Sequence, residues 1–241
     1  MPNAIILAGG FGTRLRSVVP ELPKPMAPIR GLPFLAYQMQ YWITQGITRF
    51  ILSVGYKHDV IQNYFGSQFE GVPLEYAVEK VPLGTGGGLL NAVKLCKDSV
   101  NFLLLNGDTY FEVQLTDLQK VSTLQNVSWV FSVFRTHEAD RYMGMEISAS
   151  GNILSMQNGT KKIGSLANGG VYWVKTDSLI SFSQHNSLPL SLEDDIFPEL
   201  LRSKGKMIAL EGGGQFIDIG IPQDYARAAT ILPRLKSEDL G

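Results

Sequence analysis

The sequence predicts an α/β fold in which a doubly wound, mostly parallel sheet carries an antiparallel or mixed extension. Two observations support this prediction. In the first half of the 241 residues, short β-rich runs alternate with amphipathic segments, an order that builds a parallel sheet covered by helices. In the second half, strand-like runs follow one another with turn residues between them, which is typical of antiparallel pairing.

The first half is expected to hold four strands and three helices. Right-handed crossovers should connect the strands and produce a doubly wound sheet. Gly46 and Gly66 follow the first two helical patterns, where those helices would stop. The expected strands are Ala4–Ala8, Phe50–Val54, Leu74–Val78 and Phe102–Asn106, and the expected helices are Phe34–Gln45, Val60–Phe65 and Gly87–Lys97.

The second half changes to closely spaced strands and ends in helices. Turn signals such as Ser150-Gly151-Asn152 separate the strand-like runs. Because the sequence shows no internal repeat, low-complexity tract or linker, residues 1–241 are expected to form one domain with one continuous sheet and with halves of about 1–125 and 126–241. The expected strands are Val127–Arg135, Met143–Ile147, Ile153–Met156 and Gly170–Lys175, and the expected helices are Leu192–Ser203 and Gln223–Leu232.

The composition argues against several classes of partner. The 21 basic and 22 acidic residues leave a net charge of −1, so no overall field attracts nucleic acid or an anionic membrane surface. The single cysteine, Cys96, and the absence of a signal-peptide pattern favour a reducing, cytoplasmic location. A homo-oligomer is compatible with the sequence, since Trp42 and Tyr225 fit either an interface or the core.

Three glycines follow the first predicted strand in Gly9-Gly10-Phe11-Gly12, at the carboxyl end where open α/β sheets bind ligands. They let the backbone turn sharply and let main-chain N–H groups approach an anion. A dinucleotide fingerprint needs a third glycine where this chain has Leu15, and a Walker loop needs a glycine-lysine pair before serine or threonine, which is absent. A turn without a ligand is the remaining alternative.

Arg14 and Lys24 favour a phosphate site over an empty turn. Arginine offers a planar, bidentate set of donors, and lysine adds a point charge. Two prolines in Pro23-Lys24-Pro25 fix the backbone around the lysine and reduce the entropy lost when it is positioned. This combination predicts a clamp for a triphosphate.

Asp108 and Asp218 are the candidate metal ligands. Asp108 follows the apolar run Phe102–Leu105, and Asp218 lies between two isoleucines, where an unpaired charge is costly to bury. A lone aspartate after a strand is more often a turn residue or a helix cap. The pair nevertheless fits Mg²⁺, which takes one or two carboxylates together with phosphate oxygens. No histidine or cysteine cluster indicates zinc, and the three histidines, His58, His137 and His185, are expected at the surface.

Six ordered segments, spread over residues 7–228, are LAGGFGTRL with PKPMAPI, VGYKHDVIQNYFG, PLGTGGGLLNA, LLNGDTYF, NGGVYWV and FIDIGIPQDYARA. Together they resemble the sugar-1-phosphate nucleotidylyltransferase family. The longer string LRSVVPELPKPMAPIRGLPFL resembles its D-glycero-D-manno-heptose 1-phosphate guanylyltransferase branch. The resemblance implies a Rossmann-like fold of the nucleotide-diphospho-sugar transferase type. It also implies a Mg²⁺-dependent enzyme that joins a nucleoside triphosphate, GTP being favoured, to a sugar 1-phosphate and releases pyrophosphate.

The resemblance also implies roles for individual residues. Arg14, Lys24 and Asp108 would be catalytic, and Asp108 and Asp218 would hold Mg²⁺. The sugar would be bound by Gly144, Lys162, Asn168, Gly169 and Glu193. The nucleotide would be bound by Leu7, Ala8, Gly9, Gly10, Gly12, Thr13, Arg14, Lys24, Glu79, Gly84, Thr85, Gly86, Asn106 and Gly107.

Several of these roles have alternatives. Glycines in the run 84–88 precede the apolar segment Leu89–Lys97, so their N–H groups would face a ligand, unless they only allow close packing of helix and sheet. Glu79 and its neighbour Lys80 either line the same pocket or form a solvated pair. The acidic run Ser191–Asp195 fits either sugar binding through Glu193 or helix capping.

One departure from the family pattern affects the sugar phosphate. Many relatives carry Glu-Lys-Pro before the Asn-Gly-Gly strand, whereas this chain has the sequence QNGTKK at residues 157–162. Either Lys161 or Lys162 is therefore left to bind the sugar phosphate, and the sequence does not distinguish them. The Asn168-Gly169-Gly170 segment is expected to be a loop that enters a strand.

The implied reaction needs neither a strong base nor a covalent intermediate, because a sugar phosphate is already an anionic nucleophile. Catalysis then reduces to positioning and to neutralising two crowded anions. The acceptor is expected to be D-glycero-D-manno-heptose 1-phosphate, with mannose 1-phosphate or N-acetylmuramate 1-phosphate as alternatives and GTP or UTP as donor. Two alternatives from other classes are an oxidoreductase and a non-catalytic sensor of nucleotide sugars.

Overall fold

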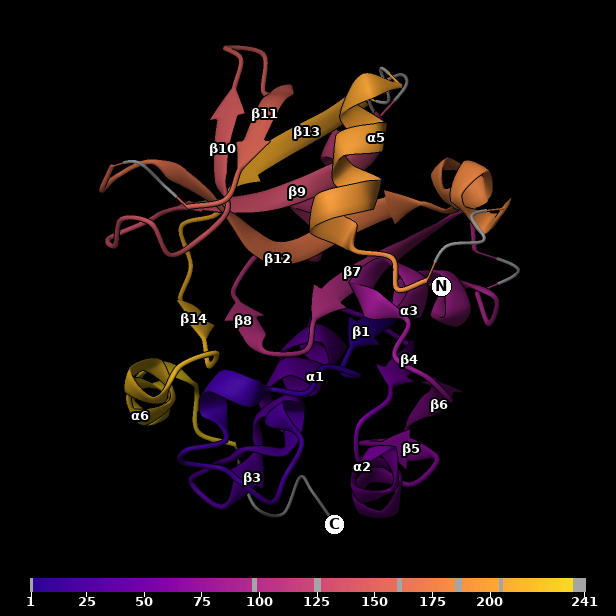
Figure 1. Ribbon diagram of the computed structural model, residues 1–241, viewed down its shortest axis with the longest axis vertical. Coiled ribbons are helices and arrows are strands. Elements are labelled where there is room, and N and C mark those ends of the chain that lie inside the picture. The colour runs from indigo at the N-terminus through magenta and orange to yellow at the C-terminus, as the bar shows by residue number, and fades with distance from the viewer. Residues whose placement is uncertain are drawn as a thin grey trace.

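The computed structural model describes residues 2–96, 99–123, 127–159, 162–184, 188–203 and 206–235. Within these residues a ten-stranded sheet forms the centre of the molecule, with helices packed against it (Figure 1). The sheet is parallel in the first half of the chain and mixed in the second, so the predicted fold class is confirmed. No helix in the described ranges is long and apolar enough to cross a membrane.

Strand β1 (Asn3–Leu7) is central to the parallel part. It pairs with β4 (Arg49–Val54) on one side and with β7 (Asn101–Asn106) on the other, and β6 (Val72–Val78) lies beyond β4. The chain therefore builds outward from β1 in one direction and then crosses to its other edge. Open α/β sheets bind ligands beyond the carboxyl ends of the strands at such a reversal of strand order.

The second half continues the same sheet. Strand β12 (Leu166–Lys175) lies antiparallel to β7, with Val171 opposite Leu105, and antiparallel to β9 (Val127–Arg135) on its other edge. Strand β13 (Lys206–Glu211) adds to β9 in parallel, while β10 (Gly144–Ile147) and β11 (Ile153–Gln157) form a hairpin. Outside this sheet, β14 (Phe216–Asp218) pairs with β8 (Thr109–Phe111), and β2 (Pro28–Ile29) pairs with β3 (Leu32–Pro33). The short β5 (Gln68–Phe69) pairs with β6 in antiparallel orientation.

The helices cover both faces of the sheet. They are α1 (Phe34–Thr44), α2 (His58–Phe65), α3 (Gly84–Val93), α4 (Leu115–Ser122), α5 (Phe197–Arg202) and α6 (Pro222–Ile231). Single 3-10 turns follow β1 at Thr13–Leu15 and Lys24–Met26, and a longer 3-10 segment spans Thr176–Gln184.

Three predicted segments differ from the structure by more than two residues or in the kind of element. Helix α3 begins at Gly84 rather than Gly87 and ends at Val93, and the predicted end, Lys97, lies outside the described residues. The helix expected over Leu192–Ser203 is a π-helical turn, Leu192–Ile196, followed by α5. The Asn168-Gly169-Gly170 segment belongs to β12 itself, where the register against β9 shifts between Asn168 and Tyr172.

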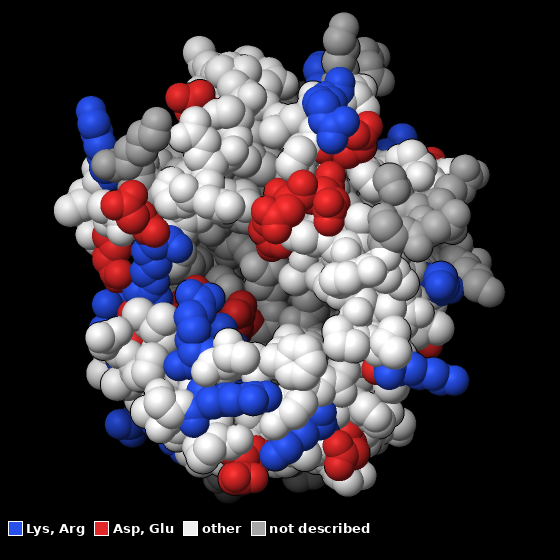
Figure 2. Space-filling view, in the orientation of Figure 1, with Lys and Arg blue, Asp and Glu red and all other residues white. Residues whose placement is uncertain are grey.

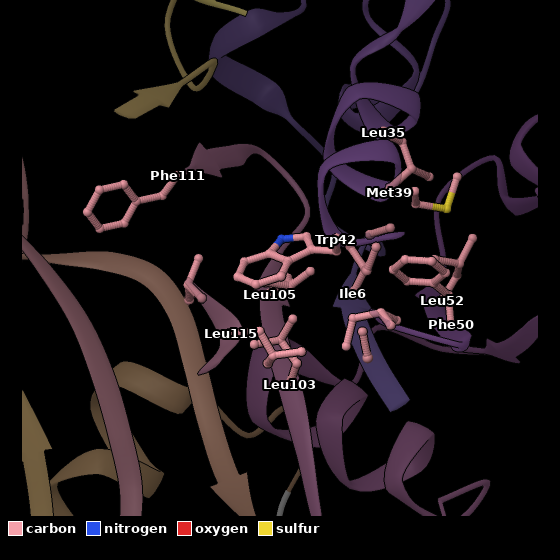
Figure 3. Close-up of a cluster of buried hydrophobic side chains, with 14 of the residues drawn as sticks. Ile6, Leu35, Met39, Trp42, Phe50, Leu52, Leu103, Leu105, Phe111 and Leu115 are labelled. Atoms are coloured by element: carbon pink, nitrogen blue, oxygen red, sulfur yellow. The ribbon is translucent and has the colours of Figure 1, made fainter. Parts of the chain in front are cut away.

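Alternate side chains of the central strands enter two separate cores. Ile6, Leu103 and Leu105 pack with Trp42 of α1 on one face, as Figure 3 shows. Ile5, Phe102 and Leu104 pack on the other face, against α3 and α5. Because both faces are buried, these strands are continuous apolar runs rather than alternating ones, which explains why the sequence predicts them well. Trp42 is 1% exposed and so belongs to the core, not to an interface of this chain.

Candidate active site

A cavity of about 600 Å³ opens where β1, β4 and β7 end. Figure 2 shows a hollow near the centre of the molecule, with Asp and Glu side chains along its upper edge and Lys and Arg side chains below it. Of the predicted site residues, those that line the cavity are Leu7, Ala8, Gly9, Gly10, Gly12, Thr13, Arg14, Lys24, Glu79, Gly84, Thr85, Asn106, Gly107, Asp108 and Glu193. The structure therefore brings most of the predicted nucleotide residues to one place.

The loops after β1 and β7 contain glycines at which a side chain would clash with neighbouring atoms. Gly12 has a φ of +58°, and a Cβ built on it would lie 3.0 Å from Cβ of Lys24. Across the sheet, a Cβ on Gly107 would lie 2.4 Å from the carbonyl oxygen of Leu7, to which Gly107 donates its N–H. The loops after β1 and β7 thus meet with backbone against backbone, and this leaves the cavity floor open for a ligand.

Lys24 meets both predicted metal ligands at the edge of this floor. Its Nζ donates to Oδ2 of Asp108 and lies 3.9 Å from Oδ1 of Asp218, while the lysine side chain is only 11% exposed. Asp108 follows β7 and Asp218 ends β14, and the pairing of β14 with β8 holds the two carboxylates together. The predicted convergence of Lys24, Asp108 and Asp218 is present in the structure.

The two carboxylates differ in pKa. Burial alone would raise the pKa of Asp108, but the charge and the hydrogen bond of Lys24 outweigh it and hold that pKa below its usual value. Burial, followed by the charge of Asp108, raises the pKa of Asp218. Lys24 therefore favours the ionised form of Asp108 more strongly than that of Asp218.

These residues fit a divalent cation. Two carboxylates that both face the ammonium of Lys24 present the hard oxygen ligands that Mg²⁺ takes beside phosphates. Among the described residues no cluster of three or more His, Cys, Asp or Glu side chains is suited to a metal. Phosphate oxygens of a ligand would complete the coordination. Of the histidines, His137 is exposed, His58 contacts Gln62, and His185 lies outside the described residues.

Glu79 lines the cavity but also braces its wall. Its Oε2 accepts the N–H of Leu83 at 3.1 Å, and its Oε1 accepts the hydroxyl of Ser53 at 3.2 Å. A Cβ on Gly9 would lie 2.7 Å from the same Oε1. Glu79 therefore joins β4, the glycine loop and the segment before α3, and its neighbour Lys80 also lines the cavity.

The glycine run of α3 serves packing. Gly86 and Gly87 donate their N–H groups to the carbonyl oxygen of Leu190 at 2.8 and 3.1 Å. A Cβ on Gly86 would lie 2.9 Å from the Ile196 side chain, and Gly86 is not among the residues that line the cavity. The expectation that these N–H groups face a ligand is therefore wrong for Gly86 and Gly87, which pack closely against the segment that holds Leu190 rather than against the sheet.

Gly84→Ala is expected to lower the free energy of unfolding by more than about 2 kcal/mol. Gly84 has a φ of +78°, and a Cβ there would lie 2.4 Å from the backbone oxygen of Leu190. Urea denaturation would measure the change. Gly213→Ala is the control, because a Cβ at Gly213 meets nothing within 4 Å. Equal effects of the two substitutions would contradict the packing role.

The acidic run at the start of the π-helical turn divides into capping and cavity residues. Ser191 accepts the N–H of Asp194 at 3.0 Å, and Asp195 accepts the N–H of Ser191 at 2.7 Å, which is reciprocal capping. Glu193 instead lines the cavity, and its Oε2 accepts the hydroxyl of Thr85 at 3.0 Å. Both interpretations of this run therefore apply, to different residues.

The other predicted sugar residues lie outside the cavity lining. Asn168 accepts the N–H of Gly170 and donates to the hydroxyl of Tyr172 at 2.8 Å. A Cβ on Gly169 would lie 2.6 Å from the Phe111 ring, so Gly169 packs against β8. Gly144 pairs with Ala167 at the edge of β12, and Lys162 is exposed. Lys161, the alternative to Lys162, lies outside the described residues.

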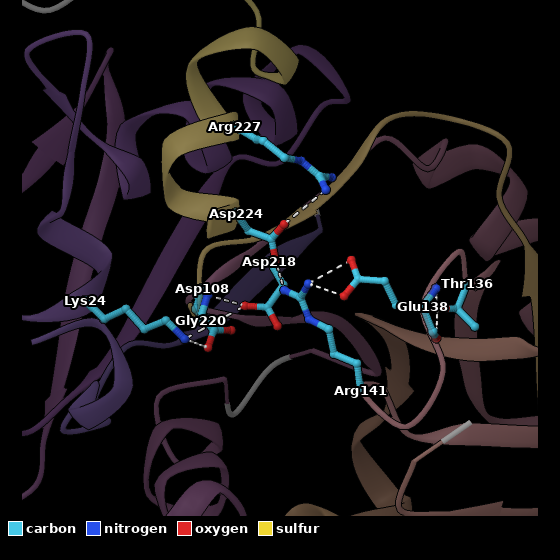
Figure 4. Close-up of polar contacts among 9 residues, drawn as sticks. All are labelled: Lys24, Asp108, Thr136, Glu138, Arg141, Asp218, Gly220, Asp224 and Arg227. Carbon is cyan, nitrogen blue, oxygen red and sulfur yellow. Dashed lines mark hydrogen bonds and ion pairs between the residues drawn. The ribbon is translucent and has the colours of Figure 1, made fainter. Parts of the chain in front are cut away.

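An ion-pair network behind Asp218 was not predicted from the sequence. Arg141 pairs with Asp224 of α6, whose side chain is 3% exposed, and its Nη1 donates to both carboxylate oxygens of Glu138 at 3.0 and 2.9 Å. Arg227 lies 3.4 Å from Asp224 on the other side. Figure 4 shows Asp218 between Lys24 and Arg141, and the charge of Arg141 opposes the rise in the pKa of Asp218.

Together, the strand order and the cavity define a class of protein: an α/β protein with a candidate ligand site at the carboxyl ends of its parallel strands. The model of the nucleotidyl transferase family matches residues 3–234 of this sequence, so the chain belongs to that family. Residues 3–234 span nearly all of the strands and helices described above.

Many known proteins resemble this chain, and three of them match nearly its whole length. The chain is 39% identical over 227 residues to D-glycero-alpha-D-manno-heptose 1-phosphate guanylyltransferase from Aneurinibacillus thermoaerophilus, covering 94% of this chain and 96% of that protein. It is 36% identical over 223 residues to the protein of the same name from Campylobacter jejuni, covering 92% and 96%. The crystal structure of HddC from Yersinia pseudotuberculosis complexed with GMP-PN matches with a TM-score of 0.81 and 33% identity, over 95% of this chain and 99% of that one.

Proposed function

We propose that this chain transfers a nucleotidyl group from GTP to D-glycero-α-D-manno-heptose 1-phosphate, giving the nucleotide sugar and pyrophosphate. The observation that carries the proposal is the meeting of Lys24, Asp108 and Asp218 at the edge of a cavity of about 600 Å³, which Lys24, Asp108 and the glycine loop line. The chain would act as one catalytic domain, which the continuous sheet supports, with the nucleotide on the first half and the sugar on the second.

The chain's residues would act by positioning and by charge. Arg14 and Lys24 line the cavity and supply the cations that hold the phosphates. Asp108 and Asp218 would hold Mg²⁺, which when bound neutralises charge that builds on the transferred phosphate. The glycine loop lets the α-phosphate approach the backbone closely, and the sugar phosphate oxygen attacks the α-phosphorus in line with the departing pyrophosphate.

The choice of substrates rests on the similar proteins. Two of them are named as heptose 1-phosphate guanylyltransferases and share 36–39% identity with nearly the whole chain, and the HddC structure was solved with GMP-PN. The net charge of −1 supports neither nucleic acid nor an anionic membrane surface as a partner. A cytoplasmic location and a homo-oligomeric state complete the proposal.

Pyrophosphate release tests the proposed function. The purified chain would be assayed with GTP, UTP, ATP and dTTP against heptose 1-phosphate, mannose 1-phosphate and N-acetylmuramate 1-phosphate, with Mg²⁺ and with EDTA. The highest kcat/KM is expected for GTP with heptose 1-phosphate, and EDTA should abolish the reaction. A flat result with every pair would defeat the enzymatic proposal, and a higher kcat/KM for another pair would defeat the choice of substrates.

A further inference from the structure

We propose that the hydroxyl of Thr85 positions Glu193, and so fixes the carboxylate expected to bind the acceptor sugar. The inference rests on the proposed function, because it deepens the role of Glu193. It assigns Thr85 to sugar selectivity, whereas the family resemblance places this residue with the nucleotide.

The contact joins two parts of the chain that are far apart in sequence. Thr85 is the second residue of α3, and Glu193 lies in the π-helical turn before α5. Thr85 Oγ1 donates to Oε2 of Glu193 at 3.0 Å and accepts the N–H of Leu192 at 2.8 Å. Both Thr85 and Glu193 line the cavity, so their contact is part of its wall.

The hydrogen-bond capacity of Thr85 favours a positioning role over a contact with a nucleobase. A threonine hydroxyl has one proton, and in this structure that proton goes to Glu193. Oε2 of Glu193 is thereby held on the α3 side. In the described part of the chain no hydrogen bond reaches its other oxygen, Oε1, so this atom is free to accept from a sugar hydroxyl.

Ser191 reaches the same oxygen of Glu193, but its hydroxyl is shared between two acceptors. Its Oγ lies 3.2 Å from Oε2 of Glu193 and 3.1 Å from a carboxylate oxygen of Asp194, and its single proton serves only one of them. The same Oγ accepts the N–H of Asp194 as the cap of the turn. Thr85 is therefore the donor committed to Glu193.

Backbone hydrogen bonds hold together the two segments that carry Thr85 and Glu193. The carbonyl oxygen of Leu190 accepts two N–H groups from the first turn of α3, and Leu190 donates its own N–H to Leu83 at 2.8 Å. Gly84 and Gly86 bring the two backbones so close that side chains there would collide with Leu190. Because the first turn of α3 and the segment at Leu190 are held together by their own hydrogen bonds, the position of Thr85 is fixed. The hydrogen bond from Thr85 therefore determines the direction of the Glu193 side chain.

The test compares Thr85→Val with Thr85→Ser. Valine keeps the branched shape and loses the hydroxyl, while serine keeps the hydroxyl. In Thr85→Val, the KM for heptose 1-phosphate is expected to rise about tenfold, the size of one hydrogen bond to a charged group. The KM for GTP should stay within about twofold, because the variant leaves the phosphate residues unchanged. Thr85→Ser should restore the sugar KM.

A double-mutant cycle shows whether Thr85 acts through Glu193. Glu193→Gln alone is expected to raise the sugar KM by at least as much as Thr85→Val. Adding Thr85→Val to Glu193→Gln should then change the sugar KM by less than about twofold, since contacting residues are not additive. Additive effects of the two substitutions would overturn the positioning role.

Other outcomes separate this inference from the proposed function. If Thr85→Val raised the KM for GTP and left the KM for the sugar phosphate unchanged, the hydroxyl would serve nucleotide binding, and the inference would be overturned. A lower melting temperature with both KM values unchanged would show a purely structural contact and also overturn it. In either case the wild-type chain still transfers nucleotide, whereas a wild-type chain without transfer for any substrate pair contradicts the proposed function itself.

Discussion

Replacing Asp108 by Asn is expected to lower kcat for nucleotidyl transfer about 10³-fold or more, because a bound cation supplies several kcal/mol of charge stabilisation. Asparagine keeps the size of the side chain and removes the charge that pairs with Lys24. The fold should survive, since the Asp108 side chain is 35% exposed and Lys24 still lies 3.9 Å from Asp218. Steady-state kinetics at saturating substrates would measure the loss.

Asp117→Asn is the matched control for this prediction. Asp117 lies on α4, is half exposed, and pairs across one helical turn with Lys120 at 3.4 Å. The same loss of one negative charge should there leave kcat within about twofold. If Asp108→Asn retained a tenth or more of the wild-type kcat, Asp108 would not be a ligand of a cation that the reaction requires.

Replacing Arg141 by Met is expected to lower the free energy of unfolding by about 3–5 kcal/mol. Methionine fills a similar volume but leaves Asp224, with a 3% exposed side chain, without its main counter-charge. The substitution also removes the guanidinium stacked 4.7 Å above the Tyr142 ring and both hydrogen bonds to Glu138. Urea denaturation followed by circular dichroism would give the change.

Arg135→Met provides the comparison for an exposed ion pair. Arg135 and Glu211 lie 2.8 Å apart with side chains 58% and 46% exposed, so their loss should cost less than about 1 kcal/mol. Adding Asp224→Asn to Arg141→Met should recover part of the lost stability, because it removes the unpaired charge. Equal destabilisation by Arg135→Met and Arg141→Met would show that burial of Asp224 does not set the effect.

The network around Arg141 helps to hold Asp218 in place. Phe216 of β14 stacks on Phe134 of β9 with centroids 3.8 Å apart and meets Tyr142 at 5.5 Å. Arg141, the neighbour of Tyr142, is paired with α6, which follows Asp218. Asp218 is therefore held from both sides, by aromatic packing before it in the chain and by an ion pair after it.

The central parallel strands were predictable because both of their faces are buried. The segments 50–54 and 102–106 are continuous apolar runs because each face of the parallel sheet has its own core. β8 and β14 have three residues each and carry no such pattern, so they were missed. The start of α3 was misplaced because glycine disfavours helix, and here the carbonyl of Leu190 overrides that propensity.

The candidate site also contains features that the sequence predicted and features that it did not. Asp108, Lys24 and the glycine loop were predicted because their place after a strand or between prolines is visible locally. The contact of Thr85 with Glu193 joins the two halves of the chain, and that of Arg141 with Asp224 joins distant segments of the second half, so no spacing in the sequence pairs them. For the same reason the sequence did not show that Asn168 and Gly169 turn toward Tyr172 and Phe111 within β12.

A crystal of the chain grown with Mn²⁺ and a non-hydrolysable GTP analogue, with the anomalous signal used to locate the metal, tests the cation-assisted site most directly. The manganese is expected to bind one oxygen of Asp108, one of Asp218 and at least one phosphate oxygen, each at about 2.1 Å as for Mg²⁺. Lys24 should then have left Asp108 and moved toward the phosphates. A metal held by phosphates alone, with the two carboxylates too far apart to reach it, would contradict the proposed site.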